Sequence, residues 1–208
     1  MKIITMRSGT TIIELLIFTA IFGILGTAVL PLLFLSSEKR LLQQTQALVE
    51  SNGTQIFKQI GASVLEAETI LDPPVQASGS VLTLQTGSGA ESPVIFAVNS
   101  GSLLLIRHAT QEILSSQQIH VEDFSVQNTS STAQSIIVSF TLSRITQIQP
   151  AHTYRRSFQA AFTLPPVDHP SGGSCGCALP SCVAGTSYTW QVCEAGCLTV
   201  STALECGT

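Results

Sequence analysis

The spacing of hydrophobic residues changes along this chain of 208 residues. From Leu15 to Ser37 no residue carries a charge, and a helix of that length, rising about 1.5 Å per residue, matches the ~30 Å hydrocarbon core of a bilayer. The run therefore predicts a membrane-spanning helix, and it is longer than the apolar region of a cleaved secretory signal. Lys2 and Arg7 precede it, which favours a cytoplasmic N-terminus and an exported body.

After Arg40 the apolar residues recur at spacings of seven and four, which is typical of a one-sided helix. They are Leu42, Val49, Ile56, Ile60 and Val64. We expect one helix from about Thr11 to Leu71, bent or frayed at Asn52-Gly53. Asp72-Pro73-Pro74 should end it, because a residue before proline disfavours helical geometry.

Beyond Pro74 short β-rich runs replace the helical period, and these predict strands at 81–86, 94–98, 103–108, 120–127, 136–142 and 154–164. Asn99-Ser100-Gly101-Ser102 has the composition of a hairpin turn. The predicted fold class is α+β: a long N-terminal hydrophobic helix packed on an antiparallel sheet, with a small cysteine-rich C-terminal extension.

A segment rich in Pro, Gly and Ser, at 165–174, reads as a linker to this extension. All six cysteines follow it, namely Cys175, Cys177, Cys182, Cys193, Cys197 and Cys206. Their spacing lacks the paired C-x2-C pattern of zinc sites, so we predict that they bind no metal. We expect them to form disulfides in an oxidising compartment, with a pairing that the sequence does not determine. Tyr188 and Trp190 are either contact aromatics of a ligand-binding or tip-exposed module or the small core of a stiffening extension.

At its N-terminus the chain resembles the type IV pilin superfamily, whose precursors carry a short basic leader ending in Gly and a hydrophobic helix with Glu as its fifth residue. The resemblance implies cleavage by a prepilin peptidase between Gly9 and Thr10 and N-methylation of Thr10. Glu14 is then the fifth mature residue, and Pro31 lies where these helices commonly carry a proline. It also implies that Glu14 pairs with the α-amino group of a neighbouring subunit during assembly.

The order of the β segments looks most like that of J-type minor pseudopilins of type II secretion or W-type minor pilins. The expected division is a leader at 1–9, a transmembrane and assembly helix at 10–36, its amphipathic continuation at 37–72, a β-sheet head at 73–164, the linker, and the cysteine-rich module at 175–208. The expected function is that of a bacterial cell-surface pilin-like subunit that primes or caps a pilus or pseudopilus.

The partners implied are other pilin or pseudopilin subunits, the prepilin peptidase and inner-membrane lipid. The expected location is the inner membrane, as a single-pass protein with its C-terminus outside the cytoplasm, and then the assembled filament at the cell surface or in the periplasm. The alternative is an uncleaved, membrane-anchored extracytoplasmic binding protein whose disulfide-rich module contacts a ligand.

Composition and motifs argue against other classes of function. Charged residues are only 11% of the chain and the net charge is −4, so bulk charge predicts no nucleic-acid binding. The common catalytic and nucleotide-binding motifs are absent from the sequence, so we predict no enzyme and no cofactor. His120 and Glu122, with Asp123 beside them, share one face of a predicted strand and are read as a solvated polar face. Arg155-Arg156 should point to opposite faces of a strand, which divides their charge.

Overall fold

The computed structural model describes residues 11–87, 92–108, 110–129, 134–146, 153–166, 178–183, 185–193, 197–204 and 206, without the side chains of 28, 31–38 and 193. One helix, α1 (Ile12–Glu66), is 55 residues long. The chain divides into two compact units, residues 1–44 and residues 45–208, so α1 contributes its first part to one unit and its second part to the other.

The strands of the second unit form three antiparallel sheets. The five-stranded sheet has the order β1-β3-β4-β5-β6 and contains β1 (Ala67–Asp72), β3 (Val81–Thr86), β4 (Val94–Asn99), β5 (Ser102–Arg107) and β6 (Thr110–Ile113). The four-stranded sheet has the order β2-β7-β8-β9 and contains β2 (Ser78–Gly79), β7 (His120–Asn128), β8 (Ser135–Ile145) and β9 (Thr153–Thr163). The C-terminal sheet has the order β10-β11-β12 and contains β10 (Ser181–Val183), β11 (Ser187–Cys193) and β12 (Cys197–Ala203).

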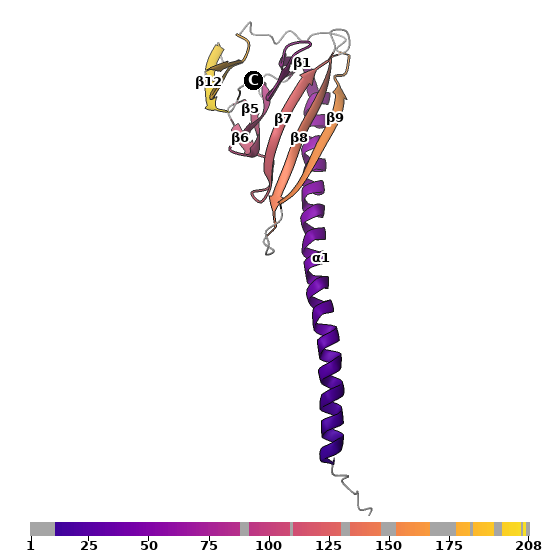
Figure 1. Cartoon of the computed structure of the whole chain (residues 1–208). Helices are drawn as coiled ribbons and strands as arrows, with labels where there is room; N and C mark the ends of the chain where they lie inside the picture. The colour runs from indigo at the N-terminus through magenta and orange to yellow at the C-terminus, as the bar shows by residue number, and fades with distance from the viewer. Residues whose placement is uncertain are drawn as a thin grey trace, which may run out of the picture. The chain divides into compact units, whose positions relative to one another are not determined.

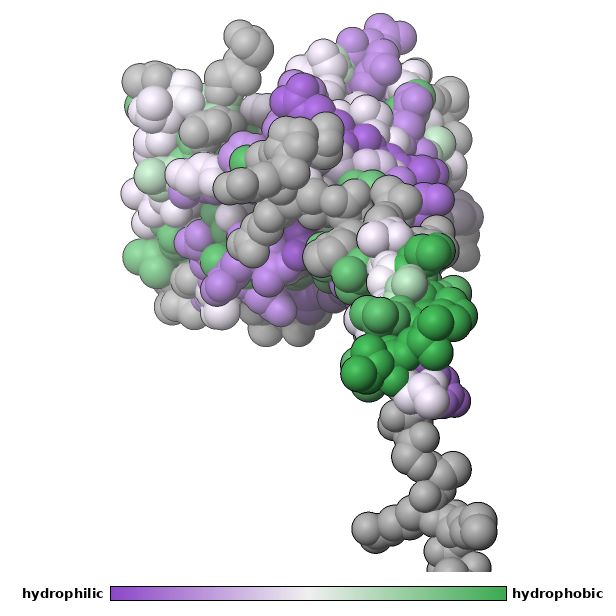
Figure 2. Space-filling view, turned by 60° about the horizontal axis from the view of Figure 1, so that its bottom comes forward, coloured by the Kyte–Doolittle hydropathy of each residue, from purple (hydrophilic) through white to green (hydrophobic). Residues whose placement is uncertain are grey.

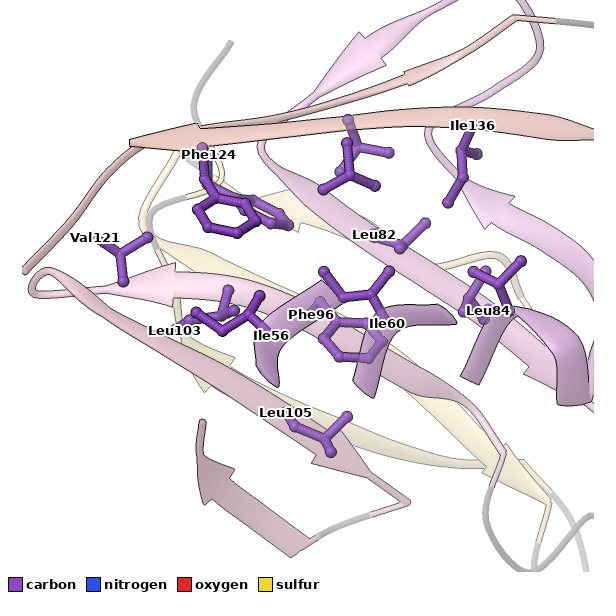
Figure 3. Packing of buried hydrophobic residues seen from close by; sticks show 14 of the residues in the cluster. Ile56, Ile60, Leu82, Leu84, Phe96, Leu103, Leu105, Val121, Phe124 and Ile136 are labelled. Carbon is purple, nitrogen blue, oxygen red and sulfur yellow. The ribbon is translucent and has the colours of Figure 1, made fainter. Parts of the chain in front are cut away.

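The main core joins the second part of α1 to the five-stranded and four-stranded sheets. Ile56 and Ile60 of the helix are at most 1% exposed and lie among side chains of β3, β4 and β5 (Figure 3). On the other side of the helix Phe57 packs against an aromatic group from β8 and β9, with ring centroids 4.9 Å from Phe140 and 6.0 Å from Phe162. The amphipathic pattern of the sequence thus buries one helix between two sheets.

The helix runs without a break through Asn52-Gly53, so the predicted bend or fraying there is wrong. Asn52 is satisfied on both sides of its amide, because Nδ2 donates to the Leu48 carbonyl (2.9 Å) and Oδ1 accepts from the Ser116 N–H (3.2 Å). Gly53 lets β9 approach, since a Cβ atom there would overlap the ring of Phe158. The glycine therefore serves helix–sheet packing rather than a turn.

The three central strands of the five-stranded sheet, β3, β4 and β5, are buried on both faces, whereas the edge strand β6 is exposed. Successive side chains of a strand point to opposite sides of the sheet. Along β4, Val94 and Phe96 enter the main core, whereas Ile95 and Ala97 enter a second core. This second core contains Val81, Ile95, Ala97, Leu104 and Ile106 of the five-stranded sheet and Tyr188, Trp190, Val192 and Leu204 of the C-terminal segment. The C-terminal sheet consequently covers the face of the five-stranded sheet that the helix does not.

The six predicted strands are confirmed as β3, β4, β5, β7, β8 and β9, with ends that differ by at most a few residues. The predicted C-terminal end of the helix is wrong: α1 ends at Glu66, and the next six residues pair with β3 as β1. Helix propensity and the downstream prolines allowed the helix to extend to Leu71. The backbone groups of residues 67–72 instead form hydrogen bonds with the edge of β3.

The predicted fold class and location are also wrong. Within the described part of the chain, no helix has both the length and the apolar composition needed to cross a membrane. The predicted transmembrane helix, and with it single-pass anchoring in the inner membrane, is thereby contradicted. The strands also form three sheets, where one antiparallel sheet was predicted. The predicted domain boundaries stay predictions.

Candidate functional site

The first part of α1 presents apolar side chains to solvent. Twelve large ones between residues 12 and 30 are 48–82% exposed, namely Ile12, Ile13, Leu15, Leu16, Ile17, Phe18, Ile21, Phe22, Ile24, Leu25, Val29 and Leu30. In Figure 2 such residues form a continuous hydrophobic area on the helix. Exposed apolar surface on this scale marks an interaction site, since single exposed side chains are normal but a contiguous apolar surface is not. We call residues 12–30 the apolar segment.

The polar groups of the apolar segment are mostly satisfied within the helix. The hydroxyl of Thr19 donates to the Leu15 carbonyl (2.7 Å), and that of Thr27 donates to the Ile24 carbonyl (2.8 Å). Glu14 differs, because it is an exposed carboxylate in the first turn, where a negative charge favours the positive end of the helix dipole. Glu14 is thus the ionisable group of a surface that is otherwise apolar.

The other predicted assembly residues are only partly described. Gly9 and Thr10, the predicted cleavage and methylation site, lie outside the described residues. Pro31 lies within α1, and its side chain is outside the described part. The predicted roles of these three residues remain predictions.

The cysteines contribute to the C-terminal sheet. Cys182 of β10 forms a disulfide with Cys206, which follows β12, and Cys197 is also disulfide-bonded. Cys193 ends β11, whereas Cys175 and Cys177 lie outside the described residues. The disulfide between Cys182 and Cys206 links two segments that are not neighbours in the sheet, and it holds the C-terminal residues beside β10.

A buried hydrogen-bond network fixes the C-terminal sheet to the five-stranded sheet. The Tyr188 hydroxyl donates to Asp72 Oδ2 (2.8 Å) and lies 2.8 Å from Thr83 Oγ1, and its side chain is fully buried. Trp190, 2% exposed, donates from its indole N–H to the His108 carbonyl (3.0 Å). The structure therefore favours the hypothesis that Tyr188 and Trp190 are core residues over the hypothesis that they contact a ligand. The sequence alone could not distinguish the two. Thr83, a polar residue between Leu82 and Leu84, was the sequence signal that could have indicated this contact.

Burial perturbs both acidic groups of this network. Desolvation raises the pKa of Asp72, an effect that the hydrogen bond from Tyr188 partly opposes. Desolvation also raises the pKa of Tyr188, and the nearby Asp72 carboxylate acts in the same direction. The network therefore holds a carboxylate that is less stable when ionised than it would be in water.

We expect Asp72→Asn to remove a pH-dependent loss of stability. Because the folded-state pKa of Asp72 is raised above its ordinary value of 3.8, the native state binds the proton more tightly than the unfolded state does. The contribution of Asp72 is thus most favourable at low pH and is lost as the pH rises through the folded-state pKa. Asparagine keeps an acceptor for Tyr188 without a charge to desolvate.

The measurement is urea unfolding of the wild type and the Asp72→Asn variant from pH 3.5 to pH 7. The stability of the variant relative to the wild type should increase from about pH 4 upward and level off once Asp72 is ionised in both states. A difference that stays constant over this range would contradict the raised pKa.

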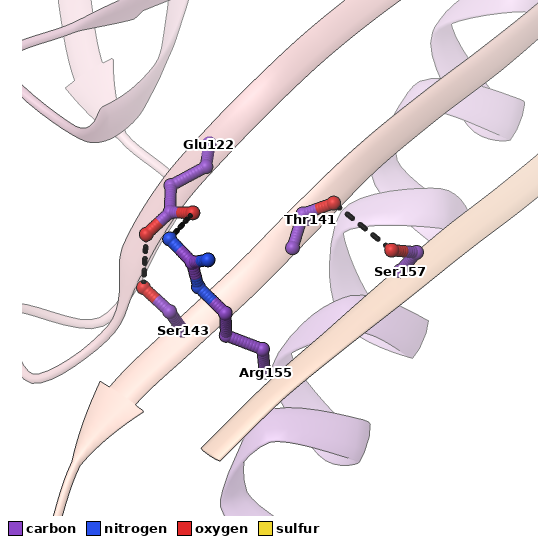
Figure 4. Close-up of polar contacts among 5 residues, drawn as sticks. All are labelled: Glu122, Thr141, Ser143, Arg155 and Ser157. Atoms are coloured by element: carbon purple, nitrogen blue, oxygen red, sulfur yellow. Dashed lines mark hydrogen bonds and ion pairs between the residues drawn. The ribbon is translucent and has the colours of Figure 1, made fainter. Parts of the chain in front are cut away.

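Glu122 of β7, one of the polar residues noted in the sequence, forms a surface ion pair. Glu122 accepts from the Ser143 hydroxyl (2.7 Å) and pairs with the Arg155 guanidinium, as Figure 4 shows. These hydrogen bonds, first that from Ser143 and then that from Arg155, lower the pKa of Glu122. His120 instead lies over Gly101, where a Cβ atom would overlap its ring. A charge interaction with His120 also lowers the pKa of Glu122, so the partners of Glu122 keep it ionised.

The two adjacent arginines point to opposite faces of β9, as predicted. Arg155 binds Glu122 on the outer face of the four-stranded sheet, whereas Arg156 binds Glu50 of α1 (2.7 Å) and lies 5.9 Å from the ring centroid of Phe158. Each guanidinium is engaged with a carboxylate, so the pair does not form a concentrated basic patch.

No protein-family model, curated protein or solved structure matches this chain. The apolar segment of α1, with Glu14, is consequently the candidate functional site on the strength of its surface chemistry alone.

Proposed function

We propose that this chain is a pilin-like filament subunit, a minor pilin or pseudopilin of a type IV pilus or a type II secretion pseudopilus, processed after Gly9. The observation that carries the proposal is the apolar segment: twelve large apolar side chains exposed along one helix whose continuation is buried in the head. A helix that exposes apolar residues on all sides needs a surrounding that covers them. Helices of other subunits provide such a surrounding.

The difference in burial between the first and second parts of α1 supports the same function. Val49, Ile56, Ile60 and Val64 are buried in the main core, so this part of the helix is packed against the sheets. The apolar segment is then free to pack with neighbouring helices while the head keeps its own fold. Glu14 would be desolvated in such a bundle, and a cationic partner offsets part of that cost. The α-amino group of a subunit that begins at Thr10 has the required charge.

N-terminal peptide mass spectrometry tests the processing step. We expect a mature chain that starts at Thr10 with a methylated amine, in cells that contain an active prepilin peptidase. A chain that still starts at Met1 in such cells contradicts the proposal.

We expect Glu14→Gln to reduce incorporation of the subunit into filaments strongly, because the variant keeps the shape of the side chain but cannot pair with a cation. Incorporation is measured as the amount of the subunit that co-purifies with sheared filaments. The matched control is Glu50→Gln, which removes an exposed carboxylate from the same helix within the head and should leave incorporation unchanged. Equal incorporation of all three proteins would contradict the assembly role of Glu14.

A further inference from the structure

The edges of the three sheets differ in how well they are protected against pairing with another strand. Natural proteins protect edge strands by making them short, by placing charges or proline on them, or by bulges. In the five-stranded sheet, β1 carries Glu68 and Asp72 and has irregular register with β3, and β6 has only four residues, including Glu112. In the four-stranded sheet, β2 has two residues and β9 carries Arg155 and Arg156.

Among the described edge strands, β12 lacks all of these protections. It has seven residues, CLTVSTA, without charge or proline, and it pairs with β11 in unbroken register from Cys197 to Ala203. It lies at the outer side of the C-terminal sheet (Figure 1), and its Leu198 is 54% exposed. The opposite edge, β10, has only three residues and follows Pro180.

The hydrogen-bond pattern identifies the backbone groups that β12 presents outward. The Leu204 N–H donates to the Thr186 carbonyl (3.2 Å), so this pair is hydrogen-bonded. Because such pairs alternate along an antiparallel ladder, the backbone groups of Thr199 and Ser201 point away from β11. The Ala203 carbonyl, which points outward by the same alternation, accepts a hydrogen bond from Asn99 Nδ2 (3.1 Å), which agrees with this assignment.

We propose that the β12 edge is a strand-pairing interface and that its partner is β12 of a second copy of this chain, in antiparallel orientation. With Val200 opposite its own copy, Thr199 lies opposite Ser201 of the other chain, and the outward N–H and carbonyl groups of each pair satisfy one another. The strand has no charge, so no like charges meet in this register.

Closure of the sheet selects a second copy over a strand of another protein. A foreign strand would cover β12 but would itself become the new edge. Two copies of the C-terminal sheet joined through β12 have β10 at both outer edges, and β10 is too short to extend the sheet. The pairing is therefore isologous and stops at two copies. It also brings a strand beside the exposed Leu198, which pairs with Val192 of the second core across β11 and β12.

Photo-crosslinking in the full-length chain tests the interface. The photoreactive residue p-benzoylphenylalanine replaces Thr199, and the chain is kept in a nonionic detergent that covers the apolar segment, so helix-mediated association does not contribute. We expect a crosslinked homodimer whose linked peptides both contain β12. The absence of a crosslinked homodimer at micromolar concentrations, or a crosslink from β12 to another segment, would overturn the proposal. So would a crosslink in cells to another protein only.

Ser201→Pro is the disrupting variant. Its N–H points away from β11, so proline removes an outward donor and keeps the pairing with β11. We expect the crosslinked dimer to decrease about tenfold or more, since outward hydrogen bonds are lost in both copies. The matched control is Gln111→Pro on the β6 edge. Leu114 N–H donates to the Leu103 carbonyl, so by the same alternation the Gln111 N–H points away from β5.

Gln111→Pro should leave the crosslink unchanged, and a dimer that persists in Ser201→Pro would overturn the proposal. Filament incorporation of the Ser201→Pro variant separates this interface from the proposed function. The helix-mediated step does not use β12, so failure of the β12 dimer leaves the Glu14 experiment unaffected, and failure of the Glu14 experiment leaves the crosslink unaffected.

Discussion

Replacing Trp190 by alanine is expected to destabilise the protein by about 3–5 kcal/mol, the cost of removing a large aromatic side chain from a packed interior. Trp190 is 2% exposed and lies in the second core, where its ring centroid is 6.5 Å from that of Tyr188. Its truncation also leaves the His108 carbonyl without the indole donor. Urea unfolding followed by far-UV circular dichroism measures the change.

The loss should be local to the C-terminal sheet. The second core shares the five-stranded sheet with the main core, but it uses the opposite face of each strand. Amide hydrogen exchange should therefore accelerate first in β11 and β12 of the Trp190→Ala variant, while amides of α1 within the head keep their protection. Val183→Ala is the control, because Val183 is 51% exposed and should change stability by less than about 0.5 kcal/mol. An equal loss of amide protection in all strands would contradict the expectation that the effect is local to the C-terminal sheet.

Ile60→Ala is expected to lower the free energy of unfolding by about 2–5 kcal/mol. Ile60 is fully buried where α1 meets both sheets, so the substitution removes buried apolar atoms and leaves a cavity. Leu65→Ala, on the same helix, provides the control, since Leu65 is 68% exposed. Chemical denaturation of the three proteins should place Leu65→Ala within about 0.5 kcal/mol of the wild type.

Equal effects of these two substitutions would mean that the helix does not bury this face in the head. The wild-type sequence already contains the pattern behind the prediction: Val49, Ile56, Ile60 and Val64 are all at most 1% exposed, whereas Leu42, part of the same periodicity, is 38% exposed. The period therefore identified the buried face correctly but not the point along the helix at which burial begins.

The strands were predictable because their apolar residues are short β-rich runs bounded by turn residues, and this information is local. The turn at Ser100-Gly101 is an example: Gly101 has φ 74°, a conformation that glycine adopts without strain. The division of those strands among sheets was not predictable. It depends on pairings such as that of β2 with β7, between residues almost 50 positions apart.

The sequence by itself determined the position of six of the twelve described strands, the buried face of the helix, the opposite orientation of Arg155 and Arg156, and an apolar N-terminal region that carries one carboxylate. Each of these depends on the period of side chains along a single helix or strand. The tertiary structure decided where α1 ends, because the edge of β3 was available to pair with residues 67–72. It also decided that residues of the C-terminal sheet cover the second face of the five-stranded sheet.

The apolar runs of β4 and β5 are buried on both faces, and local sequence does not specify which part of the chain covers the second face. Tyr188 and Trp190 reach it from about 100 residues away, and their hydrogen bonds to Asp72 and the His108 carbonyl exist only after the sheets have formed. Side-chain period is a property of neighbouring residues, whereas the partner of a buried face is chosen by packing and by the hydrogen bonds that burial requires.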